Sequence, residues 1–203
     1  MLDEELPGGG WPAGCLSEIL PAHEGIGELR LLGPGLARLS GEGKRLAWVA
    51  PPYLPYAPAL HSAGIALEQL LIVRTNTGEE ALWAAEQALR SHACGAVLLW
   101  SATLDHTALR RLQLAAESSR ALAFLFRHPG AHSQVTPAAL RLRMESADGG
   151  LAVHILKRRG MPSHRPVFIP PMTAAERNRP ARPANTNKHS PVRHGPATSV
   201  VAS

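Results

Sequence analysis

Aromatic residues and cysteines are both scarce in this chain of 203 residues. Phe, Trp and Tyr make up 4% of the residues, so the core has to be built on Leu, Ala, Val and Ile. The two cysteines, Cys15 and Cys94, are far apart in the sequence and match no metal-binding or redox spacing. We expect two buried free thiols in a reducing cytoplasm.

The sequence also lacks long hydrophobic runs and the features of a secretory leader. No apolar run approaches the ~18 residues of a membrane-spanning helix. Residues 1–6 are acidic and have neither the basic nor the apolar region of a signal peptide. We therefore expect a cytoplasmic protein with no membrane partner. An apolar content of 45% is enough for one globular core of ordinary size together with a tail.

Acidic residues are nearly absent from the last quarter of the chain. Residues 157–203 hold nine Lys or Arg and a single carboxylate, Glu176, which gives this part a charge of +8. Residues 1–156 carry 12 basic and 15 acidic side chains, so their charge is −3. The total of +5 therefore hides a basic C-terminal arm. Such an arm indicates a nucleic acid or an acidic protein surface as partner.

Short apolar runs alternate with amphipathic segments between about residues 14 and 127. The pattern predicts strands at 16–20, 46–50, 70–73, 95–100 and 121–126, and helices at 27–39, 57–63, 77–91 and 106–118. Thr77 and Asp105 are placed to cap the last two helices. Gly-Pro-Gly at 33–35 predicts a kink or break in the first helix. Continuous apolar strands of this kind are typical of a parallel sheet covered on both faces.

The pattern changes after residue 140. Segments 140–145 and 151–156 alternate partly between apolar and polar residues around Asp-Gly-Gly at 148–150, which predicts a β-hairpin. Beyond about residue 172, Pro, Arg, Asn, His and Ser dominate, and we expect disorder. The predicted organisation is a lead-in at 1–13, an α/β domain at 14–170 and a disordered, basic, Pro-rich tail at 171–203.

Residues 8–29 are built like a phosphate-binding loop without its reactive side chains. A working P-loop follows the pattern G-x-x-x-x-G-K-[ST], in which Lys contacts the phosphates and the hydroxyl holds Mg²⁺. Anchored on Gly27, this chain has Ala22 at the first glycine, Glu28 in place of Lys and Leu29 in place of Ser or Thr. A carboxylate at position 28 would repel a triphosphate.

A second requirement of nucleotide hydrolysis is also missing. An acidic residue at the end of a hydrophobic strand should help to hold Mg²⁺, yet Trp100 and Ser101 follow the run 96–99. We therefore expect no enzyme activity and no cofactor. Two alternatives stay open for the loop: a purely structural role, or weak nucleotide binding through the backbone amides at Gly25 and Gly27.

The remaining candidate functional residues are basic side chains, and they do not form a catalytic or metal-binding pattern. The ten histidines are scattered and show no metal-ligand spacing, so we expect no metal site. Lys157, Arg158 and Arg159 form the densest basic cluster, and Arg165 follows shortly afterwards. The cluster is either a solvated strand end or a contact with DNA phosphates or an acidic partner. These four residues are our candidate contact residues.

Several stretches resemble a known bacterial family. Residues 9–19, G-G-W-P-A-G-C-L-S-E-I, are similar to the lead-in of RecA-like recombinases. Residues 45–52, 64–71 and 109–117 resemble the bacterial SulA/ImuA group. The predicted hairpin and the run I-L-K-R-R-G at 155–160 favour the ImuA branch of this group. The resemblance covers roughly residues 7–170.

The resemblance implies a fold, a function and partners. It implies a degenerate RecA-like fold, with a mostly parallel sheet flanked by helices. It also implies an SOS-induced, non-catalytic accessory protein of translesion DNA synthesis. Such a protein would bind an ImuB-type polymerase homologue of the Y family, and RecA, an error-prone polymerase or DNA would be further partners. The alternative within the same group is a SulA-like inhibitor of cell division that binds the tubulin-like division protein.

Overall fold

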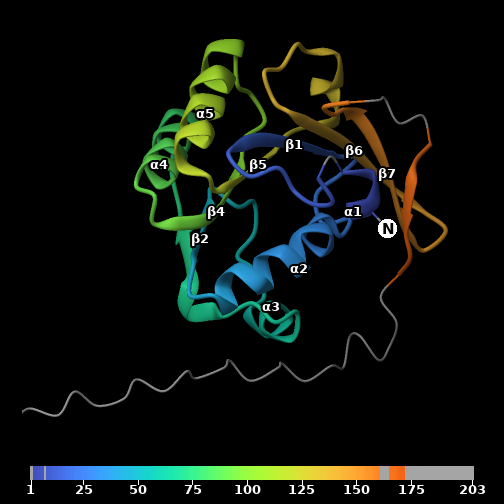
Figure 1. Cartoon of the computed structure of the whole chain (residues 1–203), viewed down its shortest axis with the longest axis horizontal. Coiled ribbons are helices and arrows are strands. Elements are labelled where there is room, and N and C mark those ends of the chain that lie inside the picture. Colours follow the sequence, from blue (N-terminus) through green and yellow to red (C-terminus); the bar gives the residue numbers. More distant parts are fainter. Residues whose placement is uncertain (1, 7, 161–164, 172–203) are drawn as a thin grey trace, which may run out of the picture.

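The fold is a mixed α/β structure in which helices flank one large sheet (Figure 1). The computed structural model describes residues 2–6, 8–160 and 165–171. The helices are α1 (Leu2–Glu5), α2 (Glu28–Gly41), α3 (Ala57–Ser62), α4 (Gly78–Arg90) and α5 (His106–Ser119), with short 3-10 turns at Leu67–Gln69 and Pro129–Ser133. The strands are β1 (Cys15–Pro21), β2 (Arg45–Val49), β3 (Leu70–Val73), β4 (Cys94–Trp100), β5 (Leu122–Phe126), β6 (Leu140–Ala147), β7 (Gly150–Lys157) and β8 (Val167–Ile169).

The strands of the described residues form a single sheet in the order β3-β2-β4-β5-β1-β6-β7-β8. The six strands from β3 to β6 in this order are parallel to one another. β7 runs antiparallel to β6, and β8 runs antiparallel to β7. The turn between β6 and β7 uses Asp148 and Gly149, both with positive φ, at the place where the sequence predicts a hairpin.

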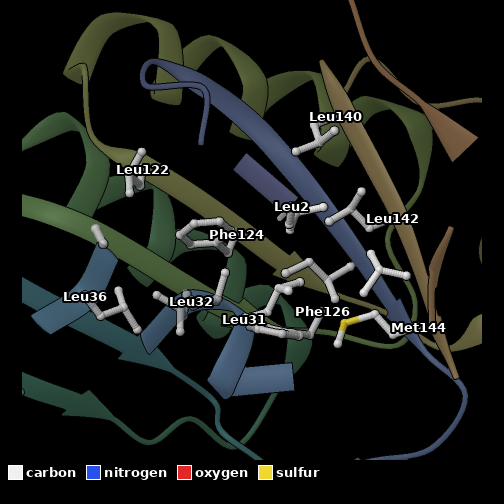
Figure 2. Close-up of a cluster of buried hydrophobic side chains, with 14 of the residues drawn as sticks. Leu2, Leu31, Leu32, Leu36, Leu122, Phe124, Phe126, Leu140, Leu142 and Met144 are labelled. Carbon is white, nitrogen blue, oxygen red and sulfur yellow. The ribbon is translucent and has the colours of Figure 1, made fainter. Parts of the chain in front are cut away.

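Alternate residues of the central strands pack into two different cores. In β5, Leu122, Phe124 and Phe126 join the core on the side of α2, while Ala123 and Leu125 join the core formed with α4 and α5. This alternation explains why the parallel strands are continuously apolar. Figure 2 shows Leu31, Leu32 and Leu36 of α2 beside the two phenylalanines of β5, with side chains of β6 nearby.

Two expectations about the elements are wrong. First, α2 runs through Pro34, so the predicted alternative of a break is wrong, while a kink stays a prediction. Proline in a helix interior costs about 3 kcal/mol, but the buried Leu32 and Leu36 on either side of it anchor the helix to the sheet. Second, residues 70–73 were expected to be a fully buried strand. They form the edge strand β3, and Leu71 is 46% exposed.

Two short elements were not anticipated from the sequence. Helix α1 places Leu2 in the core on the α2 side, and the neighbouring Leu6 is buried there too, so part of the predicted lead-in packs with the domain (Figure 2). Strand β8 is a three-residue run between prolines that extends the antiparallel side of the sheet. The predicted tail lies outside the described residues except for position 171, and the proposed domain boundaries stay predictions.

Candidate functional site

The loop between β1 and α2 has the strand–loop–helix arrangement of a phosphate-binding loop. β1 lies inside the sheet between β5 and β6, so the loop opens at the carboxyl ends of the parallel strands. Ligands of open α/β sheets bind at this edge. Gly25 and Gly27 have φ of 77° and 108°, which side-chain-bearing residues rarely adopt. The two glycines therefore turn the chain tightly into α2.

The carboxylate of Glu28 accepts hydrogen bonds from two backbone amides of this loop. The Gly25 amide donates to Oε1 over 3.2 Å and the Gly27 amide donates to Oε2 over 3.1 Å. Glu28 is 7% exposed, so water competes little for these bonds. In a working P-loop such backbone amides cradle phosphate oxygens. In this chain the Glu28 carboxylate accepts the hydrogen bonds that a phosphate would accept, so a phosphate would have to displace it.

Aromatic side chains stand where a metal-binding carboxylate would be expected. Trp100 ends β4 and stacks on Phe126, with ring centroids 4.6 Å apart and planes 10° apart. Trp48 of β2 lies 5.7 Å from the same indole. Asp105, the nearest carboxylate after the strand, accepts a 2.7 Å bond from the Ala108 amide and caps α5, as the sequence predicts.

A cleft of about 650 Å³ lies between these groups. Glu28 and Trp100 line it, together with Tyr53 from the loop after β2 and Arg127 and His128 from the segment after β5. Within the described part of the chain, no group of three His, Cys, Asp or Glu side chains could hold a metal ion. The cleft is lined by aromatic side chains and by the Glu28 carboxylate, which is already hydrogen-bonded to the loop amides. This lining suits an apolar ligand better than a phosphate.

A buried ion cluster fixes the wall of this cleft, and sequence reasoning missed it. Glu18 of β1 is fully buried, with Oε1 3.3 Å from an Arg127 nitrogen and Oε2 2.7 Å from Nε of Arg141. Arg141 also donates to the main-chain carbonyls of Ala131, His132 and Gln134. The signal was present in the sequence, because a charged residue inside an apolar strand usually needs a buried partner.

The predicted contact residues lie at the end of β7 and just before β8. Lys157 donates from Nζ to the carbonyl of Thr136 over 2.8 Å. Arg158 forms an ion pair with Glu5, with 3.1 Å between NH1 and Oε2. Arg159 and Arg165 are exposed. The first three are brought together by sequence adjacency, and none of the four lines the cleft.

The cysteines differ from expectation, because both are half-buried rather than buried. Burial raises the pKa of the Cys94 thiol, and nearby Arg45 opposes that change. Both thiols are free. Cys15 begins β1 and Cys94 begins β4, at the edge of the sheet opposite the loop before α2. They therefore contribute nothing to the cleft.

An exposed apolar loop lies beside the cleft. It follows β2 and spans residues 51–56, and we call it the aromatic loop. Tyr53, Leu54 and Tyr56 are 70%, 70% and 73% exposed. Trp83 of α4 is also 63% exposed, whereas Trp48 is buried and Trp11 packs edge-on against Phe124. Exposed apolar patches occur at protein–protein interfaces, at membrane contacts and in ligand-binding grooves.

Comparison with known proteins shows that part of this chain is similar to a SulA protein in sequence and to a solved SulA structure. Over 98 residues the chain is 34% identical to the cell division inhibitor SulA of Edwardsiella piscicida. The chain is similar to SulA. The alignment covers 48% of this chain and 58% of the relative, so the chain spans little more than half of the relative's length. This similarity supports the SulA/ImuA group at a coarse level and does not single out the ImuA branch.

The solved structure is that of SulA from Pseudomonas aeruginosa. It is 30% identical and aligns with a TM-score of 0.47, covering 58% of this chain and 99% of that protein. No family model matches the chain. In the described residues, no helix has both the length and the apolar character needed to cross a membrane.

Proposed function

We propose that this chain is a non-catalytic, SulA-like inhibitor of cell division that acts by binding the tubulin-like division protein during the SOS response. The observation that carries the proposal is the 34% identity to SulA over 98 residues. The geometry of the β1–α2 loop supports the non-catalytic part, because Glu28 takes up the amides that a nucleotide phosphate would need.

The aromatic loop is the surface that we assign to this contact. Tyrosine is one of the side chains that carry most of the binding energy of protein interfaces when they enter a partner's pocket, and this loop has two. Tyr53, Leu54 and Tyr56 are each at least 70% exposed, so they are available without rearrangement of the core. Pro51, Pro52 and Pro55 restrict the backbone of the loop, which lowers the entropy lost on binding.

The proposal is tested by inducible expression in a bacterium whose own SulA-type gene has been deleted. We expect filamentous cells with the native chain and normal cell length with Y53S/L54S/Y56S. The matched control is Val135→Ser, which changes a side chain that is 78% exposed elsewhere on the surface. Filaments should persist with this control. Normal division at high levels of the native chain would refute the proposal.

A second candidate is the translesion accessory role of the ImuA branch. The strand–loop–helix inside a mostly parallel sheet supports its RecA-like ancestry. In the same strain, a pull-down with a Y-family polymerase homologue separates the two candidates. Retention of that homologue without filamentation would favour the second candidate, and its loss on truncation of residues 157–203 would assign the contact to the basic region.

A further inference from the structure

The acidic helix α1 lies against the basic cluster at the end of β7. NH1 of Arg158 lies 3.1 Å from Oε2 of Glu5 and also donates to the main-chain carbonyl of Glu5. The Arg158 side chain is only 16% exposed, whereas the Glu5 side chain is 45% exposed. The Glu5 carboxylate therefore contacts a largely buried guanidinium and itself remains accessible to solvent.

The position of Glu5 is set by packing rather than by this ion pair alone. Leu2 and Leu6, which flank it in α1 and the following turn, are 4% and 3% exposed and belong to the core on the α2 side. The Leu6 amide donates to the Leu2 carbonyl over 3.1 Å. Three consecutive acidic residues, at 3–5, are thus carried on a helix whose Glu5 contacts Arg158, the middle residue of the basic run at 157–159.

We propose that Lys157, Arg158 and Arg159 form a binding surface for DNA phosphates, and that Glu5 covers Arg158 in the free protein. A phosphate oxygen would replace the Glu5 carboxylate on Arg158, because both are anions that a guanidinium binds with two parallel N–H groups. Lys157 uses one donor on Thr136, and an ammonium has three. This contact lies apart from the aromatic loop and goes beyond division inhibition.

DNA fits this surface better than an acidic protein does. Residues 157–203 hold nine cations and one carboxylate, so positive charge continues along the chain beyond the cluster. A partner with evenly repeated negative charge can use such a continuous run, and DNA carries one phosphate at each step.

The test is fluorescence anisotropy of the full chain with a fluorescein-labelled oligo(dT) 20-mer over a series of salt concentrations. Glu5→Gln should bind about threefold more tightly, the size expected when an accessible ion pair is removed. Its log affinity should also fall more steeply with log salt, by about 0.7, which corresponds to one additional single-strand phosphate contact. In an Arg158→Gln background, Glu5→Gln should give no gain.

Glu42→Gln is the matched control, because it makes the same charge change at an exposed carboxylate that pairs with Arg38. Equal gains from Glu5→Gln and Glu42→Gln would overturn the proposal, since they would reflect net charge alone. An undiminished gain in the Arg158→Gln background would overturn it as well. Binding of poly-glutamate in preference to the oligonucleotide would assign the surface to an acidic protein. Thermal melts of each variant show whether α1 remains packed, and Arg158→Gln alone must weaken DNA binding.

Discussion

At the scale of single residues, Glu28 determines what the β1–α2 loop can bind. The sequence alone predicts that Lys and Ser/Thr are missing, since positions 28 and 29 are Glu and Leu. It does not predict that the carboxylate turns back onto Gly25 and Gly27, because this depends on the backbone dihedrals of the loop. The same loop in an extended form would leave Glu28 in solvent.

Glu28→Ala should both destabilise the protein and make it sensitive to phosphate. Two partly buried amides would lose their acceptor, which costs about 1–3 kcal/mol for each group left unpaired. Inorganic phosphate should then bind these amides and raise the melting temperature of the variant but not that of the native chain. Differential scanning fluorimetry with and without phosphate measures both effects.

Glu42→Ala serves as the control for this substitution, because Glu42 makes an exposed ion pair with Arg38. Its melting temperature should stay near that of the native chain in either buffer. If phosphate stabilised all three proteins to the same degree, the loop amides would not be the cause and Glu28 would have no special role.

At the scale of elements, local signals were the most readable part of the sequence. Thr77 and Asp105 accept from the amides three residues onward, as a cap requires, so both helix starts are confirmed. The predictions failed where contacts between residues distant in the sequence determine the structure. The propensity of Pro34 to break a helix is outweighed by burial on both sides, and the edge position of β3 depends on strand order, which no local pattern encodes.

Removal of the α5 cap should have a moderate and specific cost. Asp105→Ala deletes the acceptor of the 2.7 Å bond from the Ala108 amide, and loss of an N-cap costs about 1 kcal/mol. Asp105→Asn keeps an oxygen at the same place and should stay within a few tenths of a kcal/mol of the native chain. Urea denaturation followed by circular dichroism measures the difference. Equal midpoints for the two variants would show that the bond contributes nothing.

At the scale of the whole molecule, the Glu18 cluster joins three neighbouring parallel strands of the sheet, β5, β1 and β6. Glu18 lies on β1, Arg141 lies on the adjacent β6, and Arg127 follows β5 on the other side of β1. The sequence shows the three charged residues but does not predict that they are in contact. Arg127 and Arg141 each lie more than 100 residues after Glu18 in the chain. Strand order brings them together.

Breaking this cluster should therefore destabilise the whole fold more than any surface change. Arg141→Leu removes one of the two arginine partners of a fully buried carboxylate and frees three carbonyls, and loss of one member of a buried pair costs about 3–5 kcal/mol. Arg143→Leu, two residues along β6, affects a side chain that is 41% exposed and should cost less than about 1 kcal/mol. Urea unfolding of both variants gives the comparison. Similar losses for the two would mean that the Glu18 cluster adds little to stability, and that backbone pairing and apolar packing of β1 with β5 and β6 hold these three strands together without it.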